Sequence, residues 1–147
     1  MKTGMYQFAP EFGKAEDNLR RIETALEGCG ADLMVLPELC TSGYQFTSKE
    51  EVKRLSVKIP ESNTVERLSQ ICKWENMFIA AGLAEEYEGR YYNSSVLVGP
   101  DGYIGTYRKV HLFYEEKDWF EPGDLGFRVW DIGEAAVGMM VCFDWIF

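Results

Sequence analysis

"VGMMVCFDWIF", residues 137–147, is a nearly unbroken apolar run that carries Cys142 and Asp144 near its middle. An uncharged run with high β-propensity is an aggregation hazard unless other parts of the protein cover it. We therefore expect residues 137–141 to form a buried strand, and Cys142 to lie where that strand turns. Either the visible chain buries this run, or further chain is needed to cover it.

Composition places the protein in the globular class. Its 147 residues are 46% apolar and 14% aromatic, enough for one domain with a packed core. The net charge of −9, without a basic block, argues against nucleic acid as a partner. The apolar runs fall far short of the roughly 20 residues that span a bilayer, and the N-terminus has no signal-peptide pattern. We therefore expect a cytoplasmic protein that binds no membrane.

The four cysteines are widely separated and contain no C-x-x-C pair. This spacing suggests neither a zinc site nor a disulfide framework. Free thiols are the simplest expectation.

Two segments have the periodicity of amphipathic helices. Within residues 16–32 and within residues 61–76, apolar side chains recur every three or four positions, with polar side chains between them. Gly28 and Gly30 are expected to end the first helix. Asn63 is expected to cap the second, with a glutamate three residues later as in a capping box.

Short apolar runs between and after these helices are expected to be strands. They are residues 33–36, 78–83, 95–98, 103–107, 127–132 and 137–141. The first two lack polar alternation, which is typical of strands buried on both faces in α/β sheets. Turn residues at 98–103 and 131–135 predict hairpins. The predicted order is β-α-β-α-β followed by more strands, and two helices cannot cover so large a sheet. Either the protein dimerises or a C-terminal half is absent.

Cys142 is a candidate nucleophile. A strand that turns sharply can present a side chain at the exposed end of a sheet, near backbone N–H groups that hold an oxyanion. The alternative is a buried structural thiol. A cysteine nucleophile needs a base, which is usually histidine, and His111 is the only histidine. It could equally be a packed or surface imidazole, so a carboxylate base must also be considered.

Two other charged residues are expected beside the core. Glu38, in VLPELC (35–40), follows the most apolar strand and the proline that ends it. Burial there would raise its pKa toward the range useful for proton transfer. Lys109, in YRKVHLF (107–113), shares a strand face with Tyr107 by alternation and would need a carboxylate partner. An exposed loop glutamate and a solvated edge-strand lysine are the alternatives.

These motifs, in this order, resemble the nitrilase superfamily of carbon–nitrogen hydrolases. The matching segments are LPEL (36–39), YRKVHLF (107–113), the FEPGD loop (120–124) and MVCFDW (140–145). The resemblance implies an α/β fold of the α-β-β-α sandwich type. Members are nearly twice as long, so residues 1–147 would form a single hydrolase domain that is incomplete at the C-terminus, truncated after the nucleophile strand.

The resemblance also implies roles for individual residues. Glu38 would be the general base, Lys109 the cation that stabilises the tetrahedral intermediate, and Cys142 the nucleophile. Glu116 would position the substrate or assist proton transfer, and its neighbour Glu115 is the competing assignment. His111 would be structural, and no metal or organic cofactor is implied.

The implied reaction converts a small nitrile or amide to a carboxylate and ammonia through a thioimidate or thioester. The stretch 107–127 is most similar to thermoactive aliphatic nitrilases, although ω-amidases and N-carbamoyl-amine hydrolases use the same catalytic residues. Tyr114, Phe143 and Trp145, with Trp119, would line a small aromatic pocket. The family also implies a homodimer or larger homo-oligomer.

Two hypotheses of other kinds remain. The chain could be a non-catalytic interaction module, whose exposed sheet edge and apolar terminus bind a partner half; Cys142 would then be unreactive. It could also be a Cys–His hydrolase of unrelated fold, whose activity would depend on His111 rather than on Glu38.

Overall fold

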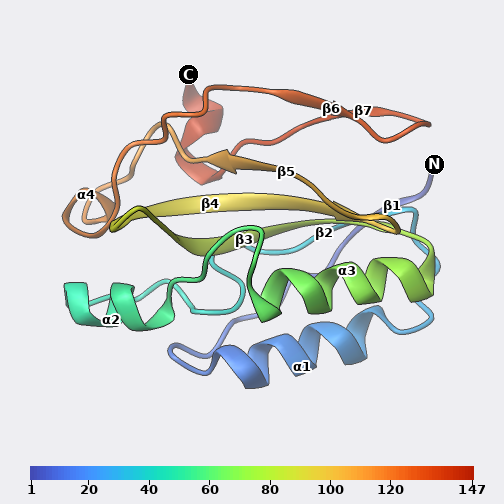
Figure 1. The fold of residues 1–147 in the computed structure, drawn as a ribbon, viewed down its shortest axis with the longest axis horizontal. Coiled ribbons are helices and arrows are strands. Elements are labelled where there is room, and N and C mark those ends of the chain that lie inside the picture. The colour runs from blue at the N-terminus through green and yellow to red at the C-terminus, as the bar shows by residue number, and fades with distance from the viewer.

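The computed structural model describes residues 1–147, which form layers around one main sheet. Three helices, α1 (Ala15–Leu26), α2 (Lys49–Leu55) and α3 (Asn63–Glu75), lie on one face of that sheet (Figure 1). The main hydrophobic core, a cluster of 19 buried residues, includes the inner faces of α1 and α3 and the sheet side chains they pack on. None of the helices combines the length and the apolarity that a membrane crossing requires.

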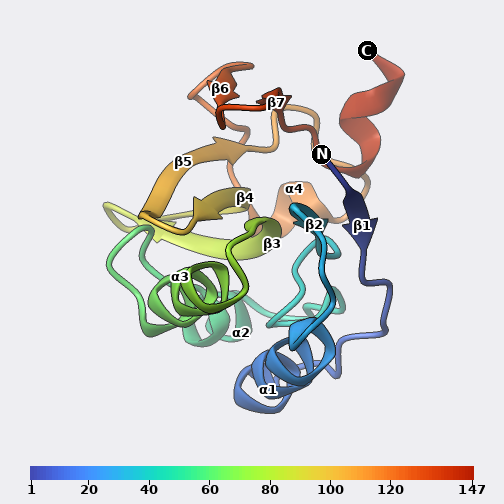
Figure 2. The ribbon, with the colours of Figure 1, turned by 90° about the vertical axis from the view of Figure 1, so that its right-hand side faces the viewer.

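The main sheet contains five strands in sequence order. They are β1 (Thr3–Met5), β2 (Leu33–Val35), β3 (Phe78–Tyr87), β4 (Arg90–Gly99) and β5 (Gly102–Arg108). The first three strands are parallel, and helices form the crossovers that parallel pairing requires. The last three are antiparallel and are joined by tight turns. Figure 2 shows the helices confined to one side of this sheet. The predicted α/β class and the hairpin between β4 and β5 are confirmed.

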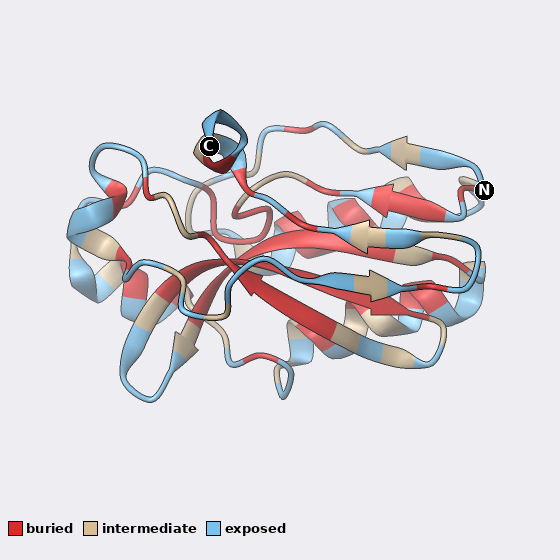
Figure 3. Cartoon of the chain, turned by 90° about the horizontal axis from the view of Figure 1, so that it is seen from above, coloured by how far each residue is buried: buried red, intermediate tan, exposed pale blue.

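The opposite face of the sheet is covered only in part. A two-stranded hairpin of β6 (Val129–Asp131) and β7 (Ala136–Gly138) lies over it, followed by a 3-10 helix (Cys142–Ile146). A second cluster of seven buried residues fills the space between this hairpin and the sheet. Seen from this side, parts of the sheet are coloured as exposed residues (Figure 3). Met5 is 77% and Val35 46% exposed.

Several local predictions need correction. Ser62, and not Asn63, caps α3, because its hydroxyl accepts the hydrogen bond of the Val65 N–H. Helix α1 ends at Leu26, before the glycines, and its buried positions include Leu19 and Ile22 as expected. Helix α2 was not predicted, because its seven residues are too few to display helical periodicity.

The strand predictions also differ in detail. The run 137–141 forms a strand only as far as Gly138, and the run 127–132 only between Val129 and Asp131. Residues 139–141 instead lead down to the 3-10 helix. Strand β2 is buried on both faces at Leu33 and Met34, as predicted, whereas Val35 at its end is exposed.

Candidate active site

Glu38 lies in the loop that follows β2 and crosses over β3. The loop is held by backbone hydrogen bonds, including Leu36 N–H to the Ala80 carbonyl and Cys40 N–H to the Gly82 carbonyl, both 2.8 Å. The loop approaches β3 so closely that only glycine fits at position 82. A Cβ there would lie 2.6 Å from the Glu38 Cα. The sequence therefore places the Glu38 carboxylate directly above the sheet.

Lys109 lies just after β5 and is fully buried. Its backbone is fixed by two hydrogen bonds of 2.8 Å, from its own N–H to the Asn93 carbonyl and from the Gly123 N–H to its carbonyl. Its Nζ lies 2.7 Å from Glu38 Oε1 and 2.8 Å from Glu116 Oε1. The ammonium thus bridges two carboxylates. A buried lysine was expected to need a carboxylate partner, and here it has two.

Glu116, at the start of α4 (Glu116–Trp119), is the buried member of the Glu115–Glu116 pair. Its Oε1 also accepts hydrogen bonds from Asn93 Nδ2 at 3.0 Å and from the Tyr44 hydroxyl at 2.9 Å. Its Oε2 accepts the backbone N–H of Phe113 at 2.6 Å. Glu115 is exposed and has no ion-pair partner. Of the two glutamates, Glu116 therefore joins the lysine cluster.

Asn93 is a member of this cluster that motif reasoning missed. Its Nδ2 donates to Glu38 Oε1 at 2.6 Å and to Glu116 Oε1 at 3.0 Å, and the residue is fully buried. The amide therefore bridges the same two oxygen atoms as the lysine ammonium. A usable signal exists in the sequence, because an asparagine inside a buried strand such as β4 is costly unless it is paired.

Cys142 begins the 3-10 helix, where its φ of +46° is unusual for a residue with a side chain. The buried Asp144 carboxylate holds this turn. It accepts the Val141 N–H at 3.0 Å, the Tyr107 hydroxyl at 2.7 Å and the His111 N–H at 2.9 Å. These bonds outweigh the effect of burial and lower the pKa of Asp144. The predicted sharp turn at Cys142 is present, and its side chain is exposed.

The charges around the thiol favour its protonated form. Although the residue is exposed, partial desolvation of the thiol by the neighbouring protein raises the pKa of Cys142 most, the Glu38 carboxylate raises it further, and the Lys109 ammonium opposes both. Burial also raises the pKa of Glu38 in spite of hydrogen bonds from Lys109 and Asn93. Burial alone would lower the pKa of Lys109, but its contacts with Glu116 and Glu38 raise it. The site thus pairs a protonated thiol with a carboxylate whose proton affinity is increased.

His111 is positioned away from this cluster. Its Nδ1 lies 2.9 Å from Asp144 Oδ1, and its ring stacks on Phe147 at 4.0 Å between centroids. The imidazole therefore supports the turn that carries Cys142, and it makes no hydrogen bond to the thiol. This arrangement argues against a Cys–His pair.

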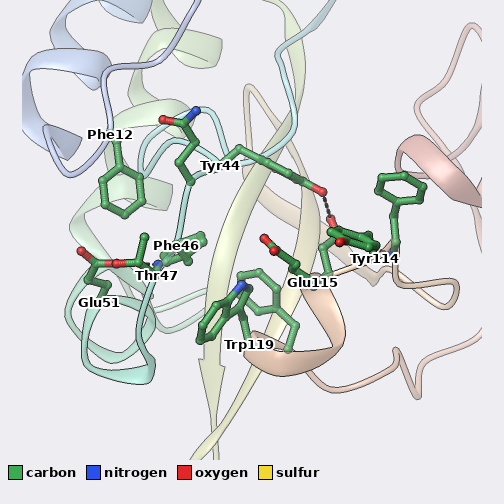
Figure 4. Close-up of a pocket in the computed structure, with 12 residues that line it drawn as sticks. Phe12, Tyr44, Phe46, Thr47, Glu51, Tyr114, Glu115 and Trp119 are labelled. Atoms are coloured by element: carbon green, nitrogen blue, oxygen red, sulfur yellow. Dashed lines mark hydrogen bonds between the residues drawn. The ribbon is translucent and has the colours of Figure 1, made fainter.

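Two cavities adjoin the cluster. The first, of about 290 Å³, is lined by residues that include Glu38, Gly82, Ser95 and Cys142. The second, of about 580 Å³, lies between the Tyr44 loop and α4, and Figure 4 shows its lining. Glu116 lies on its wall.

The predicted substrate-binding residues differ in whether they line one of these cavities. Tyr114 lines the larger one, as does Trp119. Phe143 lines neither cavity and packs on Phe113, with ring centroids 5.2 Å apart. Trp145 is 75% exposed and also lines neither. The substrate-binding role of Phe143 and Trp145 stays a prediction, because both residues lie outside the lining of these two cavities.

Residues 2–147 match the model of one protein family, described as carbon-nitrogen hydrolase. The chain belongs to the carbon-nitrogen hydrolase family. The match spans all the segments that carry Glu38, Lys109, Glu116 and Cys142. The predicted resemblance to the nitrilase superfamily is confirmed.

Individual relatives of this carbon-nitrogen hydrolase chain agree with the family. A nitrilase of Pyrococcus abyssi is 46% identical over 150 residues, covering 100% of this chain and 57% of the relative. An (R)-stereoselective amidase of a Pseudomonas species is 35% identical over 146 residues, covering 98% and 52%. The chain spans about half the length of the curated relatives it matches.

Solved structures show the same fold. A CN-hydrolase superfamily protein of Xanthomonas campestris superposes with a TM-score of 0.85 at 23% identity, covering 96% of this chain and 52% of that chain. The helix layer, the main sheet and the β6–β7 hairpin are therefore the carbon-nitrogen hydrolase fold over the residues present here.

Proposed function

We propose that the protein hydrolyses the carbon–nitrogen bond of small nitriles or amides, with Cys142 as nucleophile, Glu38 as general base and Lys109 as the stabilising cation. The observation that carries this proposal is the Lys109 ammonium, which lies 2.7 Å from Glu38 Oε1 and 2.8 Å from Glu116 Oε1. A fully buried cation held between two carboxylates beside an exposed thiol supports covalent catalysis better than a structural role.

Glu38 and Glu116 are suited to different tasks. Glu116 accepts hydrogen bonds from four donors, so both of its oxygens are already engaged. Glu38 accepts from Lys109 and Asn93 through Oε1 only. Its other oxygen is available to take the thiol proton. Glu38 is therefore the base, and Glu116 positions Lys109 and the substrate.

In the first half-reaction, the Cys142 sulfur bonds to the substrate carbon and Glu38 takes the thiol proton. With a nitrile, the nitrogen receives that proton and a thioimidate forms; addition of water and loss of ammonia then give the thioester. With an amide, the tetrahedral intermediate collapses, the C–N bond breaks, and the leaving nitrogen takes the proton from Glu38. Lys109 and the backbone N–H after Cys142 stabilise the developing negative charge.

In the second half-reaction, Glu38 removes a proton from water, which attacks the thioester carbonyl. The C–S bond breaks, the carboxylate product leaves, and the sulfur recovers its proton. Both routes require the same groups, so nitrilase, ω-amidase and N-carbamoyl-amine hydrolase activities are all chemically accessible to this site.

The test is intact-mass spectrometry of the protein with small aliphatic nitriles, amides and N-carbamoyl amines, combined with ammonia detection. We expect ammonia release and a transient adduct on Cys142. Cys142→Ala should abolish both, and Glu38→Gln should abolish turnover. Cys29→Ala is the matched control, because Cys29 is also a partly accessible free thiol but lies outside the site.

Two outcomes would replace the proposal. A folded protein with no turnover and no selective labelling of Cys142 would favour the interaction module. Activity lost in His111→Ala and retained in Glu38→Gln would favour a Cys–His hydrolase. Homo-oligomer formation stays a prediction, which sedimentation of the same samples would test.

A further inference from the structure

The larger cavity lies beside the lysine cluster, since Glu116 is one of its lining residues. It is bounded by the Tyr44 loop, the first turn of α2, and the segment from Phe113 to Phe120. In Figure 4, Glu115 points into the space between Tyr44 and Trp119. The Tyr44 hydroxyl reaches Glu116 Oε1 at 2.9 Å, so one wall of this cavity is formed by a carboxylate that also holds Lys109. Glu38 and Cys142 line the smaller cavity, so a substrate attached to Cys142 would have to pass Glu116 to reach the larger one.

The lining of this cavity is negatively charged. It contains Glu51, Glu115 and Glu116 and no lysine, arginine or histidine. The charge of Glu116 is offset by Lys109, whereas Glu115 has no ion-pair partner. Glu51 accepts hydrogen bonds from the N–H and hydroxyl of Thr47, which lower its pKa and keep it ionised. Neither Glu51 nor Glu115 forms a salt bridge, although Arg54 lies close enough to help lower the pKa of Glu51.

Aromatic side chains form most of the remaining wall. Tyr44, Tyr114 and Trp119 line the cavity together with Glu115 (Figure 4), and Phe113 is also part of the lining. The face of an aromatic ring attracts a cation through its quadrupole, and an apolar chain packs well on the same ring. An anion would be repelled by both the ring faces and the carboxylates. The protein's overall charge of −9 adds to that repulsion.

We propose that this cavity binds an ammonium group at the far end of the substrate, so that the enzyme prefers amine-bearing amides or nitriles over carboxylate-bearing ones. This inference rests on the hydrolase function proposed above and specifies its substrate class. It favours an amine-bearing substrate over an ω-amido acid. The proposal differs from simple apolar burial because it requires a cation. An uncharged chain of equal length would pack on the aromatic rings but would gain nothing from the carboxylates.

The first test compares three substrates of similar length: pentanamide, its ω-amino derivative, and an amide with a terminal carboxylate. We expect kcat/KM to fall in the order cation, neutral, anion, with roughly tenfold between the ends of the series. Glu115→Gln should reduce the cation-to-neutral ratio severalfold. Glu88→Gln, in the exposed turn between β3 and β4, is the matched control and should leave the ratio unchanged.

The second test measures binding without catalysis. Pentylammonium and n-pentanol are titrated into the protein while the indole N–H resonance of Trp119 is followed by NMR and assigned with Trp119→Phe. We expect tighter binding of pentylammonium, weakened by salt and by Glu115→Gln. If the amine binds there but no amide or nitrile is hydrolysed, the hydrolase proposal fails and the cation site stands. If substrates are hydrolysed without preference for charge and the alcohol binds equally well, the cation site is overturned and the hydrolase proposal stands.

Discussion

The Tyr107 hydroxyl donates a hydrogen bond to Asp144 Oδ2 at 2.7 Å, which ties the end of β5 to the turn that carries Cys142. The other oxygen of Asp144 accepts the His111 N–H at 2.9 Å. Because Tyr107 and His111 flank Lys109 in the chain, one carboxylate sets the position of Cys142 relative to Lys109. This matters because a positive φ at a residue with a side chain costs about 1–3 kcal/mol and persists only when its surroundings hold it.

Asp144→Asn should lower the free energy of unfolding by about 1–3 kcal/mol. The NH₂ group of the asparagine side chain would face N–H and O–H donors, and it cannot accept the hydrogen bonds that the carboxylate oxygen accepts. Urea denaturation measures the loss. The pKa of Asp144 is lowered in the folded state, so its contribution is present above the ordinary aspartate range and is lost as the pH falls through its folded pKa. The difference between the two proteins should therefore shrink in acid. Asp101→Asn, in the exposed β4–β5 turn, is the control, and equal effects of both variants would contradict the prediction.

Glu38→Gln should make the Cys142 thiol react at lower pH while abolishing turnover. The Glu38 carboxylate contributes to the raised pKa of the thiol, and a neutral amide removes that contribution. The pH midpoint of alkylation by iodoacetamide, followed by intact mass, should therefore move down. Glu88→Gln should leave the midpoint in place. A midpoint that rises in Glu38→Gln would show that the carboxylate does not act on the thiol as inferred.

Asn93→Ala should move the acidic limb of the kcat/KM profile to higher pH. The Asn93 amide lowers the pKa of Glu38, so its removal raises that pKa further and protonates the base at a higher pH. A hydrogen bond to a charged group corresponds to a shift of about one pH unit. Asn63→Ala, exposed at the start of α3, is the matched control. An unchanged acidic limb would mean that Glu38 is not the group whose ionisation produces that limb.

Gly82→Ala should destabilise the protein by about 1–3 kcal/mol and impair turnover, because the new methyl group must displace backbone. Its Cβ would lie 2.6 Å from the Glu38 Cα and 2.7 Å from both Leu39 N and the Pro37 carbonyl oxygen. Gly138→Ala is the control, since the nearest atom there is at 3.7 Å. Thermal unfolding and ammonia release measured on both variants would check the prediction, and equal behaviour of the two would refute it.

The sequence by itself determined those helices and strands that show a hydrophobic pattern within their own residues. Apolar spacing predicts α1 and α3, and apolar runs bounded by turn residues predict β3, β4 and β5, because each pattern reflects which side of a short segment is buried. Glu38 and Lys109 could be named as candidates from the sequence, but exposed alternatives stayed open for both, and their roles came from the resemblance of their motifs to the nitrilase superfamily. A charge placed beside the core is costly without a partner, and such residues are therefore visible in a single chain.

Only the tertiary structure decided which side chains meet. Lys109 and Glu38 are separated by 71 positions and Asn93 and Glu38 by 55, so no local pattern reports their contact. The burial of Glu116 rather than Glu115 follows from the way α4 begins, and Phe143 and Trp145 lie on the 3-10 helix that starts at Cys142, outside the lining of both cavities. Residue type limits what a side chain can do, whereas the crossing of strands and loops decides what it faces.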